Sequence, residues 1–368
     1  MSRARDLADL GGSADAGTVT GDSLIINGDM AVAQRATLAT GVGNGDSGYH
    51  TVDRFQFVET NSPTGEFTMS QSTEAPEGFG NSLKMECTTA DTTLGSDDAL
   101  EIRTVLEGQN LQVFKKGTSN AEKMALSFWV RSDKTGTYTI GLIDKDNSNR
   151  ITSKSYSIDT ANTWEYKILI FDGDTTGAFA NDNGRSLDIG WYLGAGANFK
   201  SGTLATIWQA NDTADRVHSS QVNLSDTVGN EWYITGVKLE VGSTATNFKH
   251  ESYAENLAKC QRYYQRFTES TTSNGFCNGT SYSNLAHYFV FHHPVRMRTR
   301  ASIGYSALSD LKLYTQGASA YPTTVAFQGG TDGTTEFYCN TSAIGSGGNG
   351  IWIRLYTSNA AFDFSAEL

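Results

Sequence analysis

The fold of this chain is decided by residues 232–267, which read WYITGVKLEVGSTATNFKHESYAENLAKCQRYYQRF. In the part ITGVKLEVG, apolar and charged residues alternate strictly: Val237, Lys238, Leu239, Glu240 and Val241. A period of two with the charges on one face predicts a half-buried β-strand. Gly242 ends this strand, and the residues after it predict a loop.

The second half of the same stretch predicts one short amphipathic helix. Ser252 is a candidate N-cap, and Glu255 stands three residues later, as in a capping box. Apolar side chains then recur at intervals of three and four residues: Tyr253, Leu257, Cys260, Tyr264 and Phe267. Because so short a helix is not stable alone, we expect it to pack between two domains.

The composition predicts an all-β protein. Charged residues are only 18% of the chain and aromatic residues 11%, while 38 glycines accompany 4 prolines, as in proteins with many turns. A net charge of −12 disfavours binding to a phosphate backbone, so we expect no nucleic acid partner. No apolar run has the length of a membrane span, so we expect no membrane insertion.

Strand-like runs and turn residues divide the chain into four parts. We expect an arm over 1–22, a β-sandwich of about ten short strands over 23–248, a linking helix over 249–268 and a smaller β-sandwich over 269–368. The last part is short for an independent core, which favours association with copies of itself.

The four cysteines form no CxxC pair, so a zinc site is not expected: Cys87, Cys260, Cys277 and Cys339. We expect buried free thiols, as in a protein made in a reducing cytoplasm. A disulfide between Cys260 and Cys277 stays open at this point.

Several motifs, in their order along the chain, resemble those of bacteriophage tail-fibre and appendage proteins. They are INGDM followed by YHTVDRFQF, then MALSFWVRSDKTGTYTIGL, ITGVKLEVG, CQRYY, HPVRMRTRASI and the terminal FDFSAEL. In that family a jelly roll resembling a carbohydrate-binding module is followed by the CQRYY helix and a C-terminal β domain. The resemblance covers nearly all of residues 23–248; each motif is weak, but their order is specific.

The resemblance implies a virion protein, assembled in the host cytoplasm and released by lysis, that binds host surface polysaccharide without turning it over. It also implies a homotrimer, with the helix at the trimer axis as an alternative to an interdomain strut. The arm is either a disordered leader or an anchor on other virion proteins, with candidate attachment residues Arg3, Arg5, Leu7 and Leu10. Alternatives are a capsid decoration or head-fibre protein and, with less support, a polysaccharide depolymerase.

Sugar sites combine aromatic faces, which stack on the apolar side of a pyranose, with polar groups for its hydroxyls. We expect Tyr192 and Trp208, on the predicted strands SLDIGWYLG and ATIWQA, to provide the faces. The polar rim would come from Arg185, Asp188, Gln209 and Asn211. Alternation puts Trp191 in the core and Tyr192 outside, and the tryptophans expected in the core are Trp129, Trp164, Trp191 and Trp232.

A structural calcium ion is a further expectation, on weaker grounds. The run DKDNSN (144–149) lacks the glycine and the twelfth-position glutamate of an EF-hand loop, which excludes that motif. By analogy with the family, Asp29 and Glu240 are the candidate ligands.

We expect no enzymatic activity, because no nucleophile elbow, Walker A loop, HExxH pair or Rossmann glycine pattern is present. Glycosidase carboxylates leave little local signature, so the depolymerase alternative stays open.

Overall fold

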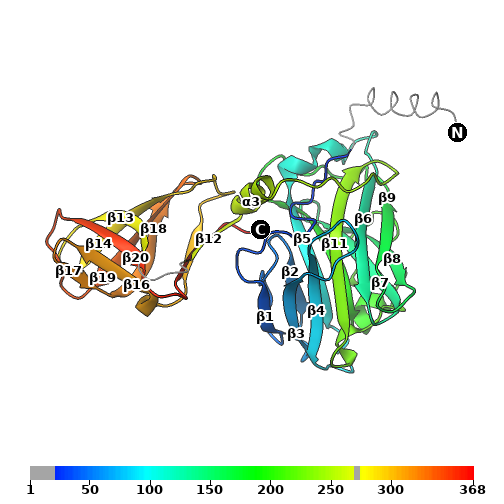
Figure 1. Ribbon diagram of the computed structural model, residues 1–368. Coiled ribbons are helices and arrows are strands. Elements are labelled where there is room, and N and C mark those ends of the chain that lie inside the picture. The colour runs from blue at the N-terminus through cyan, green and yellow to red at the C-terminus, as the bar shows by residue number, and fades with distance from the viewer. Residues whose placement is uncertain (1–20, 269–273) are drawn as a thin grey trace. The chain divides into compact units, whose positions relative to one another are not determined.

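The computed structural model describes residues 21–268 and 274–368 (Figure 1). The chain divides into two compact units, of which the first ends at Asn256 and the second is Leu257–Leu368. The predicted attachment residues Arg3, Arg5, Leu7 and Leu10 lie outside the described residues. Among the helices that the structure describes, none is both long enough and apolar enough to span a bilayer.

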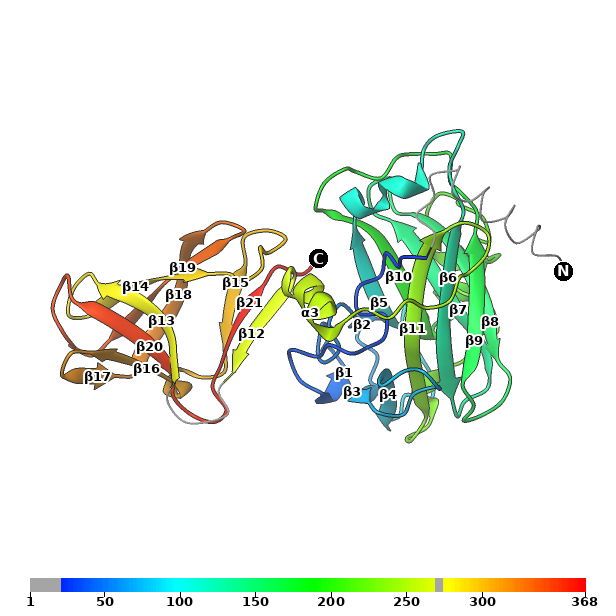
Figure 2. The ribbon, with the colours of Figure 1, turned by 45° about the horizontal axis from the view of Figure 1, so that its top comes forward.

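The described part of the first unit is an antiparallel β-sandwich (Figures 1 and 2). In spatial order, its six-stranded sheet contains β1 (Leu38–Gly43), β3 (Glu66–Ser72), β4 (Ser82–Thr89), β11 (Glu231–Val241), β6 (Met124–Ser132) and β9 (Glu165–Phe171). The five-stranded sheet contains β2 (Gln56–Thr60), β5 (Ala99–Glu107), β10 (Arg185–Ala195), β7 (Gly136–Asp144) and β8 (Arg150–Ile158). The connections include η1 (Gly108–Phe114), α2 (Ala197–Lys200), η2 (Thr213–Asp215) and η3 (Leu224–Asp226).

The core of this unit lies between the two sheets, because alternate residues of each strand point inward. On β10, Ile189 and Trp191 are fully buried, and from the other sheet Phe128 and Trp232 meet them in one cluster. The rings of Phe128 and Trp191 are 5.9 Å apart in an edge-to-face arrangement. Each such side chain contributes about 1.5–3 kcal/mol on burial. The antiparallel β-sandwich predicted from the strand pattern is therefore confirmed.

The INGD motif is a tight turn that runs along β11. Asn27, with a φ of +61°, is buried; its Nδ2 donates to the carbonyls of Val32 and Asp53 at 2.8 and 2.9 Å. The Val237 amide donates to the carbonyl of Gly28 at 2.9 Å. A Cβ on Gly28 would collide with the Val237 carbonyl oxygen, so only glycine permits this approach.

The second unit is a smaller β-sandwich, as predicted. Its three-stranded sheet contains β12 (Tyr264–Thr268), β21 (Ala361–Ser365) and β15 (Ser302–Tyr305). Its seven-stranded sheet contains β17 (Ala318–Ala320), β16 (Leu311–Thr315), β20 (Gly350–Leu355), β13 (Asn274–Ser281), β14 (Ala286–His292), β19 (Thr334–Thr341) and β18 (Pro322–Gly330), with η4 (Leu308–Asp310) before β16. Phenylalanines from both sheets pack together in its core, such as Phe276, Phe291 and Phe364.

Helix α3 (Tyr253–Gln261) begins as predicted but ends earlier. The capping box is present, since the Ser252 amide donates to Glu255 Oε2 at 3.1 Å and the Glu255 amide donates to Ser252 Oγ at 3.3 Å. Tyr264 and Phe267 are not on the helix; they belong to β12 and pair with β21. The helical stripe predicted through these two residues is therefore wrong, because pairing with a strand far along the chain decides their conformation.

No disulfide occurs among the described residues; Cys87, Cys260 and Cys339 are buried as expected, whereas Cys277 is only partly buried. Burial raises the pKa of the Cys87 thiol to about 11, as does a nearby Asp226 carboxylate to a lesser degree. Burial also raises the pKa of Cys277 to about 11. Neither thiol is therefore activated for exchange at neutral pH.

Candidate functional site

The predicted stacking residue Tyr192 is buried, which corrects the expectation that its ring is exposed. Alternation rightly puts Tyr192 on the side of β10 opposite the main core, but only 2% of its surface is accessible. The segment after β10 folds over that side of the sheet and packs Phe199 and Val217 against the ring. Gln221 Nε2 also donates to the carbonyl of Tyr192 at 2.9 Å.

Trp208 does not present a free ring face either. The predicted strand ATIWQA is not formed; the segment only makes a bridge between Gln209 and Ile151. Trp208 is 8% exposed, and its Nε1 donates to the carbonyl of Asp172 at 2.9 Å. The ammonium of Lys116 lies 5.4 Å from the centre of the indole. Both predicted stacking rings are thus used by the fold itself.

The predicted polar rim residues are also engaged within the protein. Arg185 makes a bidentate pair with Asp188, with Nε–Oδ1 at 2.6 Å and Nη2–Oδ2 at 2.5 Å. Gln209 donates to Asp215 at 2.8 Å, and Asn211 accepts from the guanidinium of Arg216 at 2.9 and 3.1 Å. The six predicted residues therefore do not form an open site.

The outer face of the six-stranded sheet instead carries an open groove of about 310 Å³. We call it the aromatic groove, and it is lined by Glu77, Gly78, Phe79, Trp129, Tyr166, Asn247, Phe248 and His250. Trp129 of β6 and Tyr166 of β9 are register partners, so both point to the same side of the sheet. Their ring centres are 5.2 Å apart, and the rings are tilted by 43°.

Three further rings, from outside the sheet, also line the aromatic groove. Phe79 comes from the β3–β4 connection, while Phe248 and His250 follow β11. Their centres lie 4.9–5.2 Å apart in pairs. Gly236 lies at a bulge in β11 and has a φ of +63°. It makes room for Phe79 and Trp129, because a Cβ there would lie 2.8 Å from Phe79 Cζ and 3.1 Å from Trp129 Cδ1.

The polar rim of the aromatic groove has groups that a ligand can use. Glu77, Asn247 and His250 are exposed. In the described residues, the side chains of Glu77 and Asn247 make no hydrogen bond or ion pair. A carboxylate accepts hydrogen bonds, and an amide both donates and accepts them, as sugar hydroxyls do.

A buried ion pair on β11 fixes the segment that carries Asn247 and Phe248. Lys238 and Glu240, predicted as the charged face of the strand, are 0% and 2% exposed, and Nζ–Oε1 is 3.1 Å. Lys238 Nζ donates to the Asn247 carbonyl at 3.0 Å, and Glu240 accepts from the Thr246 amide at 2.7 Å. The solvated strand face predicted there is wrong, because residues 242–247 fold back over it.

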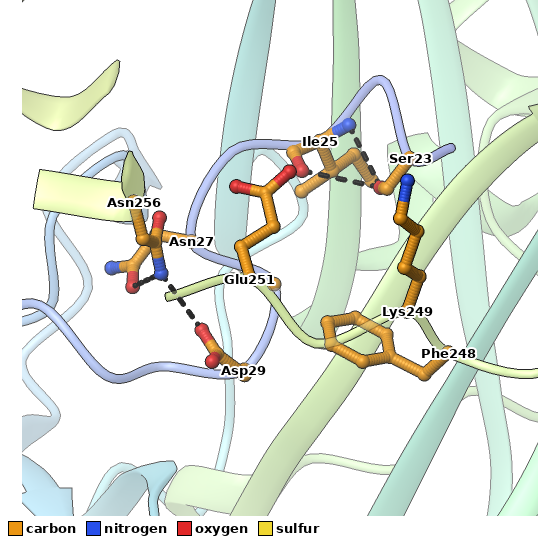
Figure 3. Close-up of a pocket in the computed structure, with 9 residues that line it drawn as sticks. Ser23, Ile25, Asn27, Asp29, Phe248, Lys249, Glu251 and Asn256 are labelled. Atoms are coloured by element: carbon orange, nitrogen blue, oxygen red, sulfur yellow. Dashed lines mark hydrogen bonds between the residues drawn. The ribbon is translucent and has the colours of Figure 1, made fainter. Parts of the chain in front are cut away.

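The two predicted calcium ligands serve separate local interactions. Glu240 is neutralised by Lys238, as described above. Asp29 Oδ1 accepts from Asn256 Nδ2 at 3.0 Å beside a cavity of about 20 Å³, room for a single water molecule (Figure 3). Within the described ranges, no three or more His, Cys, Asp or Glu side chains are grouped so that they could hold a metal ion. Calcium binding stays a prediction that these contacts do not support.

One residue of the aromatic groove could have been found from the sequence. Trp129 was predicted in the core, although the alternation of its strand indicates the outer face. Phe128 and Val130 are both fully buried, so alternation on SFWVRS places Trp129 outward. Trp191 and Trp232 are fully buried as predicted, whereas Trp129 and Trp164 are partly exposed on the outer face. Phe79 and His250 had no local signal, because they come from distant segments.

No family model and no curated protein matches this sequence. Solved structures with some similarity include a putative sugar-binding protein from Bacteroides thetaiotaomicron (11% identity, TM-score 0.33, covering 60% of this chain and 100% of that chain). The xylan-binding CBM22-2 domain from Paenibacillus barcinonensis has 12% identity and a TM-score of 0.30, and the match covers 60% of this chain and 99% of that chain. The enzymatically active domain of bacteriophage CBA120 tailspike protein 4 has 13% identity and a TM-score of 0.32. The match covers 60% of this chain and 21% of that chain. With TM-scores this low, function has to be inferred from the chain's own residues.

Proposed function

We propose that this protein binds carbohydrate non-covalently through the aromatic groove. The observation that carries the proposal is the pairing of Trp129 and Tyr166 in an open groove whose rim includes Glu77 and Asn247. A pyranose has an apolar C–H face that fits an aromatic ring and a hydroxyl edge that needs polar partners. The groove offers both, side by side.

The geometry also favours an extended sugar chain over a compact apolar ligand. Aromatic rings make up much of the lining of an open groove on a sheet surface, and the side chains of Glu77 and Asn247 beside them are exposed. A small apolar ligand would be held better by an enclosed pocket that buries most of its surface. We propose binding without turnover; an assay for reducing ends released from bound polysaccharide should therefore stay at background.

We further propose that the protein is a surface-binding component of a phage particle, present in three copies and attached through residues 1–22. The support is the order of sequence motifs, together with a jelly roll, the helix α3 and a second β-sandwich in that order. Single sugar sites are weak, and several copies on one particle raise the effective affinity. Deleting residues 1–20 should leave glycan binding intact and remove the protein from purified particles.

The test of glycan binding compares three variants of the full chain on a glycan array. Trp129→Ala and Tyr166→Ala should each weaken binding about tenfold, since ~1.4 kcal/mol per stacking ring corresponds to that factor. Ile168→Ala is the matched control, because Ile168 is 47% exposed on the same strand as Tyr166 and does not line the groove. Equal binding by all three variants would reject the site.

A further inference from the structure

The second unit has a groove of its own, on the outer face of the seven-stranded sheet. Its volume is about 430 Å³. We call it the amide groove, lined by Asn278, Gly279, Gln316, Asn349, Gly350 and Trp352. These residues come from β13, from the turn between β16 and β17, and from β20 with the loop before it. Two strands and two loops therefore converge on one surface.

The indole of Trp352 is held in place by its neighbours. Tyr314 and Trp352 are register partners on β16 and β20, and their rings are stacked with centres 6.1 Å apart and planes 9° apart. The guanidinium of Arg354 lies 4.5 Å from the centre of the Tyr314 ring and 5.9 Å from that of Trp352. A ligand that stacks on Trp352 therefore meets a ring already ordered, which lowers the entropic cost of binding.

Three amide side chains line the groove together with this indole, and all three are exposed: Asn278, Gln316 and Asn349. Within the described ranges, none of the three side chains has a hydrogen-bond partner. A primary amide donates and accepts at once, and so does a sugar hydroxyl. No charged side chain of the described residues lines the groove.

The loop that carries Asn349 is tied to β13, although its sequence, GSGGNG, is rich in glycine. The Gly348 amide donates to the Ser281 carbonyl at 2.8 Å, and the Ser281 amide donates to the Asn349 carbonyl at 2.9 Å. The Asn349 amide donates to the Ser346 carbonyl at 3.2 Å. Asn349 is thereby positioned beside the groove before any ligand arrives.

Gly350 keeps the amide groove open. It is the register partner of Thr280, two residues from Trp352 on the same face of β20, and a Cβ on it would meet nothing within 4 Å. A larger side chain there would project into free space beside the indole. A substitution of Gly350 can therefore fill the groove without removing the side chain of any other lining residue.

We infer that the amide groove is a second saccharide-binding site, specific for a neutral sugar. Trp352 stacks on the apolar face of the ring, and the three amides bind its hydroxyls. The guanidinium of Arg354 is engaged with the Tyr314 ring and does not line the groove, so it offers little to the carboxylate of an acidic sugar. Binding should therefore favour neutral sugars and depend little on salt. The inference stands on the second unit alone and does not depend on the aromatic groove.

The experiment uses the full chain labelled with 5-fluorotryptophan, whose six tryptophans give separate ¹⁹F resonances. The Trp352 resonance is assigned from its loss in Trp352→Phe. The probes are cellotriose, maltotriose, mannotriose, chitotriose and, as the acidic probe, trigalacturonic acid. At least one neutral trisaccharide should shift the Trp352 resonance, and the acidic one should not.

Two variants separate this site from the aromatic groove. Gly350→Leu should abolish the shift while leaving the Trp352 resonance present, and Trp129→Ala should leave the shift unchanged. The inference is overturned if no trisaccharide moves the Trp352 resonance, if only the acidic one does, or if Gly350→Leu has no effect. It is also overturned if Trp352→Ala lowers the mass measured by light scattering, because this face would then be a contact between copies. A Trp129 resonance that no saccharide shifts would count against the aromatic groove and leave this inference standing.

Discussion

At the scale of single residues, a buried ammonium group other than that of Lys238 joins several loops of the first unit. The side chain of Lys116 is 1% exposed and lies 2.5 Å from Asp144 Oδ2 and 3.1 Å from Asp174 Oδ2. It also donates to the carbonyls of Thr176 and Gly177 at 2.8 and 2.9 Å. All its hydrogen-bonding capacity is thus used, and the loops at this end of the sandwich are joined through it.

Lys116→Met should destabilise the first unit by about 3–5 kcal/mol, because the buried Asp144 carboxylate loses its counter-charge and Asp174 keeps only that of Arg150. Urea unfolding of the full chain measures this. Lys123→Met is the control: Lys123 is 52% exposed and pairs with a half-exposed Asp172, so the expected change is about 0.5 kcal/mol or less. Similar midpoints for the two variants would show that the buried network has no special role.

His293 makes the second unit sensitive to pH. Its Nδ1 lies 3.0 Å from Gln265 Oε1 and its Nε2 lies 2.9 Å from Thr335 Oγ1. Burial, with a smaller contribution from His292, lowers the pKa of His293 from 6.5 to about 4. The unfolded chain therefore takes up a proton at a higher pH than the folded one does, so stability is full above pH 6.5 and falls toward pH 4.

Thermal unfolding of the second unit should accordingly show a falling midpoint between pH 6.5 and 4. His293→Gln should reduce the dependence of the midpoint on pH but not remove it. The remaining dependence comes from His287, whose pKa is also lowered by burial. An identical slope in the variant would contradict the assignment to His293.

At the scale of elements, the bulge in β11 connects the fold to the binding surface. Gly236 has a left-handed φ, and its missing side chain lets Phe79 and Trp129 approach. Gly236→Ala should cost about 1–2 kcal/mol of stability from backbone strain and should also weaken glycan binding by displacing Phe79.

Gly80→Ala is the matched control for that substitution. Gly80 is next to Phe79, and a Cβ on it would meet nothing within 4 Å. Melting temperature and glycan binding should therefore stay unchanged in Gly80→Ala. If Gly236→Ala binds glycan as the wild type does, the aromatic groove does not depend on the position of Phe79.

The strands themselves could be predicted because their alternation is local. The runs SLKMECTT and GTYTIGLID are β4 and β7. What covers the outer face of a strand could not be predicted: a period of two assigns Tyr192 to a face, but residues far along the chain decide whether that face meets solvent. The same reason explains Lys238, which was predicted in solvent and is buried under its own loop. Likewise Tyr264 could not be assigned to β12 without knowledge of β21, its distant partner.

At the scale of the whole molecule, two units with separate cores each carry an open groove on an outer sheet face. Surface binding through weak sites calls for several copies, and we predict a trimer. Light scattering of the full chain should give three times 39.8 kDa. A monomeric mass at micromolar concentration would remove the multivalent part of the account.

The central claim is that Trp129 and Tyr166 hold a sugar. A crystal structure of the full chain soaked with the tightest glycan from the array tests it most directly. The account predicts a pyranose ring against these two side chains, with hydroxyls near Glu77 or Asn247. Glycan density elsewhere on the first unit, with an empty aromatic groove, would contradict it.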